Sequence, residues 1–295
     1  MTKKAGEMNS SKDFEHRLRE LDLSLFATID SQSDDGDRRS WLTLQRVVRR
    51  LKNSYTYLEI GSHLGGSIQP HLLDPRCQRI YSIDKRPVEP PDDRHQRFRY
   101  DGNSTERMLS NLRALDPNQV AKVFCFDSDA RGVDLTQISD PPDLCFIDGE
   151  HTKGAVLSDF DFCVRVCSSQ AIICFHDDWI IYPALAEIIR GLRKRGTRFA
   201  AFKLHGSTFA IALGSSSIPE DDLIQEIAVN GRLFILRMRV RRLLKQVLPA
   251  PLLPIARRLR RLLVRHTTNT AAPTRQPATR SPTNDVTADR PRKNS

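Results

Sequence analysis

Short apolar segments alternate with helical stretches through the central part of the chain. Five runs of apolar and β-branched residues are predicted as strands, and each is followed by a loop and a stretch with helical spacing: residues 55–60, 79–83, 122–126, 144–147 and 171–175. Strands that alternate with helices form a parallel sheet covered on both faces. Residues 199–204 and 208–213 predict a closing strand hairpin. The expected fold class is α/β, a doubly wound, mostly parallel seven-stranded sheet that ends in a hairpin.

Composition divides the chain into four parts. Residues 1–38 are mainly polar with a weak helical signal, and residues 39–215 hold all the predicted strands. The first clear helix is expected to begin at Ser40, a typical N-cap residue, because apolar residues follow it at helical spacing. Residues 216–266 are predicted as a basic amphipathic helical region, and residues 267–295 have too few apolar groups to fold.

The positive charge of the chain lies in its C-terminal part. Residues 231–295 contain 16 Lys and Arg against two acids, so the formal charge of +10 for the whole chain leaves residues 1–230 at −4. Between Leu252 and Leu263 the apolar residues fall on one side of a helix and the arginines on the other. This pattern predicts peripheral contact with an anionic membrane surface. A helix that packs on the domain or on a second subunit, with its arginines in water, is the alternative.

Cysteine usage and the N-terminus predict a cytoplasmic protein, which could rest peripherally at the inner face of the membrane. Three of the six cysteines lie inside predicted buried strands, and the first residues lack an apolar signal region. No run approaches the roughly 18 apolar residues of a membrane span. Cys163 and Cys167 are one helical turn apart but have no second Cys or His pair, so we expect core residues there rather than a metal site.

Ligands of an open parallel sheet bind beyond the carboxyl ends of its strands. The first strand is followed by Gly61, Ser62 and Gly65, where glycine lets the backbone turn sharply and approach a ligand. The spacing Gly-x-x-x-Gly-Gly differs from the dinucleotide pattern Gly-x-Gly-x-x-Gly. The second strand ends at Asp84, and a carboxylate there can accept hydrogen bonds from both hydroxyls of a ribose.

These two strand ends together resemble the S-adenosylmethionine site of class I methyltransferases, which have a Rossmann-like fold. In that family the acid before the glycine loop and the loop itself hold the amino-acid end of the cofactor. The third strand end matches the place where such enzymes hold the adenine. The resemblance implies the following cofactor-binding residues: Glu59, Gly61, Ser62, Gly65, Asp84, Asp127, Ser128 and Asp148.

The fourth and fifth strand ends narrow the resemblance. Ile-Asp-Gly-Glu-His at 147–151 and Phe-His-Asp-Asp at 175–178 look like the methyltransferase group that includes the macrocin and aminocoumarin sugar O-methyltransferases. The similarity covers roughly residues 55–180. The sequence departs from the pattern at 168–170, where Ser-Ser-Gln replaces the usual Pro-Gly-Gly turn. That difference changes a turn more than the site.

Three carboxylates are expected to converge at the ends of two neighbouring strands: Asp148, Asp177 and Asp178. Crowded like charges are costly unless a cation neutralises them, and oxygen ligands favour Mg²⁺. The resemblance implies the same metal role for these three acids. The alternative is that Asp148 caps a helix and the other two are solvated loop residues.

Methyl transfer to oxygen is an in-line displacement that needs an aligned, deprotonated hydroxyl. The candidate bases are Glu150, His151 and His176. The resemblance points to Glu150, because an acid two residues after the first metal ligand is the base in the sugar methyltransferases. Hydrogen-bonded loop histidines are an equally good interpretation of His151 and His176.

The function predicted from the sequence is metal-assisted O-methylation of a sugar or another hydroxylated small molecule with S-adenosylmethionine. Two alternatives keep the fold: an RNA methyltransferase that uses the basic tail, and a non-catalytic scaffold. The acidic body disfavours nucleic acid, and the set of uncompensated acids disfavours a scaffold. Neither the methyl acceptor nor the oligomeric state follows from the sequence, and a homo-oligomer is compatible with it.

Overall fold

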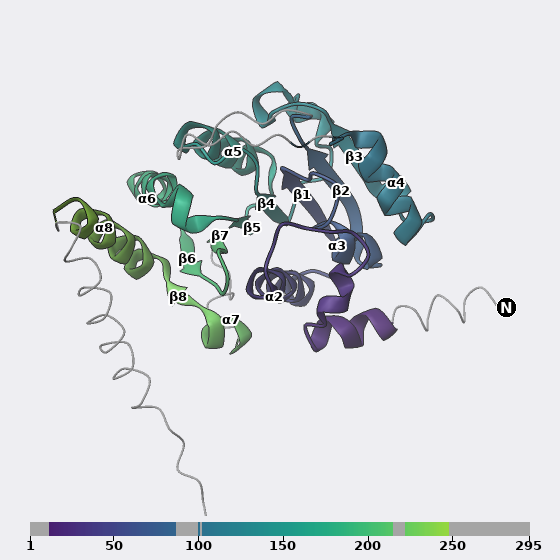
Figure 1. Ribbon diagram of the computed structural model, residues 1–295, viewed down its shortest axis with the longest axis horizontal. Coiled ribbons are helices and arrows are strands. Elements are labelled where there is room, and N and C mark those ends of the chain that lie inside the picture. The colour runs from purple at the N-terminus through teal and green to yellow at the C-terminus, as the bar shows by residue number, and fades with distance from the viewer. Residues whose placement is uncertain (1–11, 87–99, 101, 215–221, 248–295) are drawn as a thin grey trace, which may run out of the picture. The chain divides into compact units, whose positions relative to one another are not determined.

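The central element of the computed structural model is one mixed sheet (Figure 1). The model describes residues 12–86, 100, 102–214 and 222–247. Within them eight strands pair in the order β3-β2-β1-β4-β5-β7-β6-β8. The strands are β1 (Tyr55–Ile60), β2 (Cys77–Ile83), β3 (Val123–Phe126), β4 (Leu144–Ile147), β5 (Ile172–Phe175), β6 (Phe199–Lys203), β7 (Phe209–Leu213) and β8 (Val229–Asn230). The pairings among β1 to β5 are parallel, whereas β7 runs antiparallel to both β5 and β6.

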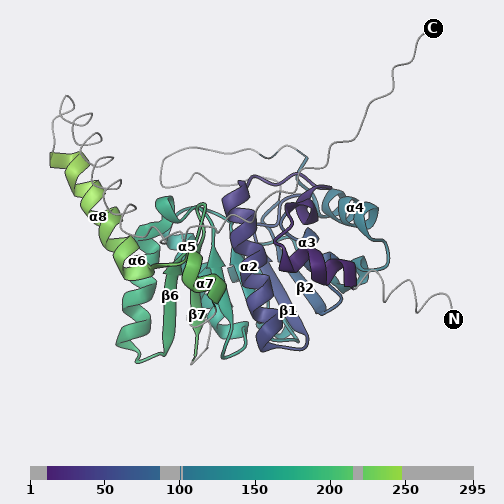
Figure 2. The same ribbon diagram turned by 90° about the horizontal axis from the view of Figure 1, so that it is seen from below.

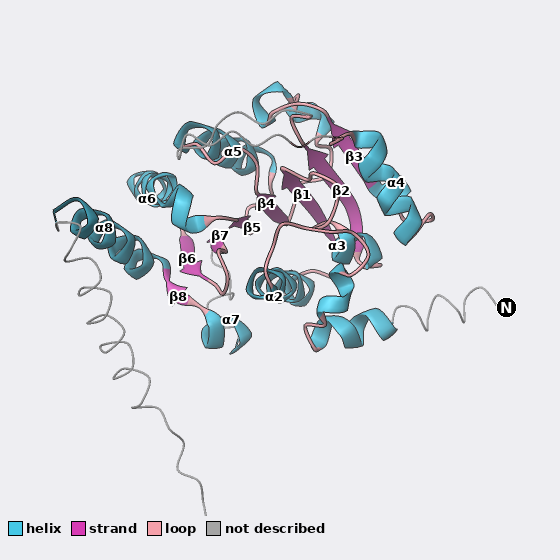
Figure 3. Cartoon of the chain, viewed as in Figure 1, coloured by secondary structure: helices cyan, strands magenta, loops and turns pink. Residues whose placement is uncertain are grey.

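Helices connect the strands and cover both faces of the sheet (Figures 1 and 3). Their bounds are α2 (Asp35–Leu51), α3 (Gln69–Leu73), α4 (Thr105–Leu115), α5 (Lys153–Val166), α6 (Asp178–Lys194), α7 (Asp222–Ile227) and α8 (Gly231–Val247). Residues 12–19 are also helical. Short 3₁₀ helices lie at Leu23–Phe26, Val120–Lys122, Ala130–Gly132 and Leu135–Gln137. The chain divides into two compact units, residues 1–241 and 242–295, and the second contributes only the end of α8 to the described residues.

Two apolar cores lie on opposite faces of the sheet. Along β1 the side chains alternate, so Tyr57 belongs to one core and Leu58 to the other. The first core packs β1 against α2, α3, α4 and the N-terminal segment, and Figure 2 shows α2 lying across this face. The second core packs the sheet against α5 and α6. A sheet buried on both faces leaves its carboxyl edge as the place where polar side chains gather.

The α/β fold predicted from the alternation of strands and helices is confirmed, including the closing hairpin of β6 and β7. The sheet has eight strands instead of seven, because the short strand β8 adds to the outer edge through pairs of Val229 and Asn230 with β6. Two residues carry too little periodicity for a sequence pattern to predict such a strand.

The predicted start of the first clear helix is wrong. α2 begins at Asp35, and Asp34 is its N-cap, with a capping box formed by Asp34 and Asp37. Ser40 lies inside the helix, is buried, and donates a hydrogen bond from Oγ to the carbonyl oxygen of His205 at 3.1 Å. Asp at N-cap and N3 is as effective a signal as Ser, but apolar spacing begins only after Ser40.

The predicted helix between Leu252 and Leu263 and the tail at 267–295 lie outside the described residues. In the part of the chain that the structure describes, the helices are too short or too polar to cross a membrane. The proposed division at residues 38, 215 and 266 stays a prediction. Cys163 is buried in the second core, as expected for a core residue.

Candidate functional site

Four strand ends meet at the carboxyl edge of the sheet. Because β1 pairs with β2 on one side and β4 on the other, and β4 pairs with β5, the residues after these strands lie next to one another. Gly61 follows β1, Asp84 follows β2, Asp148 follows β4 and His176 follows β5. The order reverses between β1 and β4, the position where ligands bind in doubly wound sheets.

The loop after β1 is folded tightly against the loop after β4. Gly61 has φ +93°, and a Cβ there would overlap the backbone carbonyl of Asp148. His63 has the left-handed value φ +44°, and Gly65 has φ +87°. Only glycine adopts the Gly61 conformation without both strain and collision. The glycine therefore lets the ends of β1 and β4 approach each other and form one continuous surface.

A first hollow opens on one side of Gly61. Its walls include four polar side chains, Asp84, Ser128, Glu150 and Asp159, together with the apolar side chains of Ile60 and Ile83. The mixed polar and apolar lining is that of a site for a small organic ligand. Asp84, Ser128 and the Gly61 backbone are in the positions predicted to hold the cofactor, and the structure brings them to this hollow.

Asp84 is held in place by the glycine loop and by an arginine. Its Oδ2 accepts a hydrogen bond from the backbone N–H of His63 at 2.6 Å and lies 3.8 Å from Nη2 of Arg86. The buried guanidinium of Arg86 also contacts Oδ1 of Asp127 at 3.1 Å and donates to the carbonyl oxygen of His63 at 3.2 Å. Arg86 was missed on the sequence, because its role depends on strands that are distant in the chain.

Asp127 and Ser128 point to different neighbours. Asp127 is exposed and accepts hydrogen bonds from Arg86 and from Thr105. Ser128 lines the first hollow, whereas Asp127 is not among the lining residues. The predicted adenine contact is therefore favoured for Ser128 over Asp127.

Glu59 is fully buried beneath the loop. Its two carboxyl oxygens accept hydrogen bonds from the hydroxyls of Tyr57, at 2.9 Å, and Ser67. Burial raises the pKa of Glu59 to about 8, against the lowering effect of these two hydrogen bonds. The Glu59 side chain thus holds the loop after β1 in place through these hydrogen bonds. Its contact with the cofactor stays a prediction.

A second hollow lies on the other side of Gly61. Trp41 and Tyr100 supply aromatic rings, and Ser62, His151 and Asp177 supply polar groups. Nε2 of His151 lies 3.4 Å from Oδ1 of Asp148 and 3.7 Å from Oδ2 of Asp177. The structure therefore places His151 in the second hollow, whereas Glu150, its neighbour in sequence, lines the first.

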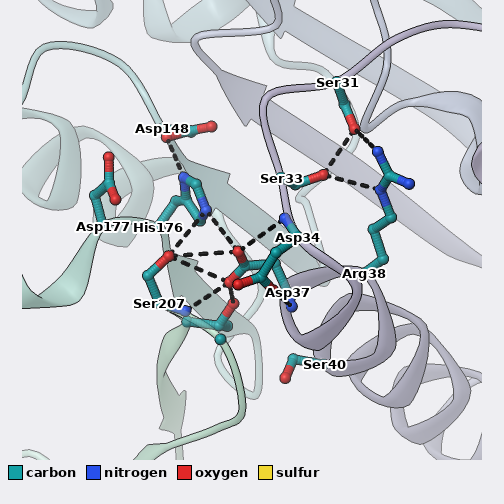
Figure 4. A network of polar contacts seen from close by, with 12 residues as sticks. Ser31, Ser33, Asp34, Asp37, Arg38, Ser40, Asp148, His176, Asp177 and Ser207 are labelled. Carbon is teal, nitrogen blue, oxygen red and sulfur yellow. Dashed lines mark hydrogen bonds and ion pairs between the residues drawn. The ribbon is translucent and has the colours of Figure 1, made fainter.

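His176 is buried between two carboxylates (Figure 4). Its Nδ1 lies 3.0 Å from Oδ1 of Asp148, and its Nε2 lies 3.2 Å from Oδ2 of Asp37 and from Oγ of Ser207. Burial alone would lower the pKa of His176, but Asp148 and Asp37 raise it to about 11. A ring that holds a proton on both nitrogens cannot act as a base near neutral pH, so the prediction of His176 as a catalytic base does not fit the structure.

Asp37 completes this network and was missed on the sequence. It comes from the first turn of α2 and accepts hydrogen bonds from Ser207 N at 2.7 Å and Thr208 Oγ1 at 3.0 Å. Burial would raise the pKa of Asp37, but His176 and these donors lower it to about 2. The pattern Asp34-x-x-Asp37 identifies the start of a helix. It does not predict that Asp37 contacts His176, which lies 139 positions later.

The three carboxylates expected to bind Mg²⁺ do not form a shared ligand set. Asp178 is turned into the protein and pairs with Lys203 at 2.8 Å. Asp148 is engaged by His176, and the cations His176 and Lys203 supply the compensation that sequence reasoning assigned to a metal. In the described part of the chain no group of three or more His, Cys, Asp or Glu side chains could hold a metal ion. The residues present do not fit the expected site.

The central part of the chain matches a known sequence family. Residues 58–177 match the family described as a methyltransferase domain, so the chain contains a segment with the sequence of such a domain. The match begins within β1 and ends at Asp177, so it includes every residue that lines the first hollow. The second hollow is lined partly by the matched segment and partly by earlier residues such as Trp41. No curated protein matches the chain.

Several solved structures resemble the chain at low sequence identity. The O-methyltransferase TomG of Streptomyces achromogenes, in complex with SAM, is 16% identical, with 70% of this chain and 90% of that chain covered and a TM-score of 0.44. An O-methyltransferase of Bacillus cereus in complex with SAH is 15% identical, with 68% and 91% covered and a TM-score of 0.42. The calicheamicin methyltransferase CalS11 is 13% identical, with 71% and 93% covered and a TM-score of 0.48. These likenesses assign no substrate to this chain.

Proposed function

We propose that this protein transfers a methyl group from S-adenosylmethionine to a hydroxyl group of a sugar or another hydroxylated small molecule. The observation that carries the proposal is the position of Gly61 at the border of two hollows within the segment that matches a methyltransferase domain. A ligand that crosses Gly61 has its nucleoside part in the first hollow and its reactive end at the second. Two substrates must meet at one point for an in-line displacement.

The first hollow supplies the groups that a nucleoside needs. Asp84 presents a carboxylate that is already oriented by His63 and Arg86, and Ser128 presents a hydroxyl on the neighbouring wall. Ile60 and Ala130 are apolar residues in the lining of the same hollow, as a planar ring requires. When bound, S-adenosylmethionine supplies a methyl group on a sulfonium as the electrophile. The assignment of Asp84 and Ser128 to the cofactor is supported by these orientations.

His151 is the base in this proposal. Of the three candidates named from the sequence, His151 and His176 line the second hollow, and the carboxylate contacts of His151, at 3.4 and 3.7 Å, are longer than those of His176, at 3.0 and 3.2 Å. The acceptor hydroxyl would give its proton to the imidazole as its oxygen bonds to the methyl carbon, and the methyl–sulfur bond would break with its electron pair left on sulfur, as an uncharged thioether. Asp148 and Asp177 both lie near Nε2 of the ring and stabilise the imidazolium that results.

The aromatic and polar walls of the second hollow support a hydroxylated acceptor. Trp41 and Tyr100 can pack against the apolar face of a sugar ring, and the hydroxyls of Ser31 and Ser67 can hydrogen-bond to its edge. Metal assistance has no part in this proposal, because Asp178 pairs with Lys203 and is withdrawn from the expected ligand set.

Transfer of radiolabelled methyl groups from S-adenosylmethionine to a panel of sugars and phenols tests the proposal. We expect His151→Gln to lower kcat at least about 100-fold while leaving cofactor affinity within about threefold, since general-base catalysis contributes roughly 10²–10⁴. Glu150→Gln is the matched comparison, because Glu150 lines the other hollow and should keep turnover with an acceptor. If Glu150→Gln abolishes transfer and His151→Gln does not, the assignment of the base is wrong. Lack of cofactor binding by the folded protein would favour a scaffold.

A further inference from the structure

One face of helix α8 packs against the sheet. Ile235 is 6% exposed and belongs to the second core. The ring of Phe234 lies 5.8 Å from that of Phe209 on β7, measured between centroids. A Cβ at Gly231 would lie 2.7 Å from a backbone oxygen of β6, which shows how closely the helix starts on the sheet. The orientation of this part of α8 is therefore fixed by apolar contacts.

The opposite face of α8 is apolar and exposed. Leu233, Leu236 and Val240 are 42%, 58% and 45% exposed. At about 100° per residue these three side chains fall within roughly 60° of one another, on the side away from Ile235. We call them the outer apolar face. Single exposed leucines are common, but three in one stripe on a helix mark a surface that another apolar medium covers.

Arginines border the outer apolar face on both sides. On the helical wheel Arg237 and Arg241 flank one edge and Arg232 and Arg239 the other, and all four are exposed. Residues 231–247 include no acid. A helix with an apolar stripe between two rows of arginines has the pattern of helices that lie in a lipid interface, with the stripe among acyl chains and the guanidinium groups at phosphates.

We propose that α8 is a membrane-docking helix that places the outer apolar face in a lipid bilayer bearing anionic headgroups. Charge complementarity selects this occupant. Docking of a second copy through the same face would bring the arginine rows of two helices together without acids between them. Nucleic acid would engage the arginines and leave the outer apolar face in water.

The sequence that follows the described side chains of α8 is also apolar in part and strongly basic. Val247 keeps the apolar spacing of the stripe, and residues 231–295 carry +14 formal charges. Each Lys or Arg near an anionic surface contributes roughly 1 kcal/mol of attraction, which corresponds to about fivefold in binding. The inference concerns where the protein acts, and it holds independently of the reaction proposed for the site.

Sedimentation of the full-length protein with vesicles tests the proposal. The probes are vesicles of phosphatidylcholine alone and of phosphatidylcholine with about 30% phosphatidylglycerol, an anionic lipid. We expect binding to the anionic vesicles only. The triple variant Leu233→Ser, Leu236→Ser, Val240→Ser should bind at least about tenfold more weakly. The matched control changes two exposed apolar residues elsewhere, Leu135→Ser and Val164→Ser, and should bind as the wild type does.

Four results would overturn the proposal. One is absence of binding to anionic vesicles, and another is a triple variant that binds as tightly as the control while circular dichroism shows both folded. A concentration-dependent dimer that the triple variant loses in ultracentrifugation would identify a second copy as the occupant. Retention on single-stranded RNA at a salt concentration where vesicles do not bind would identify nucleic acid instead.

Discussion

Replacement of Asp159 by asparagine is expected to stabilise the protein at neutral pH. Asp159 is 6% exposed, and its carboxyl group lines the first hollow next to Glu150. Burial raises the pKa of Asp159 to about 7, with further raising by Asp129 and Glu150 and opposition from Arg131. An asparagine keeps the shape of the side chain and has no charge to bury.

The size of the effect follows from the two pKa values. The ordinary value is 3.8 and the folded value is about 7, a difference of about 3 units, which corresponds to roughly 4 kcal/mol. Because the folded pKa is raised, folding favours the protonated acid. Wild-type stability therefore falls as pH rises from about 4 to about 7 and changes little above that range. The asparagine variant does not lose stability in this way, so the difference in unfolding free energy between variant and wild type should grow over the same pH range.

Urea unfolding at pH 4 and pH 8 measures the difference. We expect wild type and Asp159→Asn to be within about 1 kcal/mol at pH 4, and the variant to be more stable by about 3 kcal/mol or more at pH 8. Asp161→Asn is the matched control on the same helix, because Asp161 is exposed and pairs only with Arg165 at the surface. An advantage of Asp159→Asn that is equal at both pH values would refute the reasoning.

Three further changes test the contacts around the site. His176→Gln leaves the carboxylate of Asp37 buried without its cation, and urea unfolding at pH 7 should show a loss of about 3–5 kcal/mol. Lys203→Met should cost about 3 kcal/mol for the same reason, and adding Asp178→Asn should restore more than half of it. Gly61→Ala should lower thermal stability and abolish cofactor binding, because its φ is +93° and a Cβ meets the Asp148 backbone.

The controls for these changes use exposed positions of the same residue type. His205→Gln is the control for His176, since His205 is exposed. Gly154→Ala is the control for Gly61, because a Cβ at Gly154 meets nothing within 4 Å. Gly154 lies in helix α5, where alanine is more favourable than glycine by about 1 kcal/mol. If a control variant loses as much stability as the variant at the site, the contacts named for that site do not contribute specifically to stability.

The strands of the sheet could be predicted because they are short apolar runs between turns. The same logic places Gly61, Asp84 and Asp148 at one edge, since residues after parallel strands must meet there. β8 could not be predicted, because its two residues pair with β6 through the backbone and carry no side-chain pattern.

The direction of each side chain at the site could not be predicted in the same way. Asp177 and Asp178 are neighbours in sequence, yet one reaches His151 and the other turns inward to Lys203. Glu150 and His151 likewise separate into two hollows. Adjacent residues at a strand end can point in opposite directions, so spacing alone suggested a three-acid metal site that the structure does not assemble.

The central claim is that S-adenosylmethionine binds across Gly61, and isothermal titration calorimetry with purified full-length protein tests it most directly. The account predicts saturable binding at one site per chain. Asp84→Ala should lose this binding, and His151→Gln, whose side chain belongs to the second hollow, should keep it. Lack of binding by folded wild type, or binding that is unchanged in Asp84→Ala, would contradict the account.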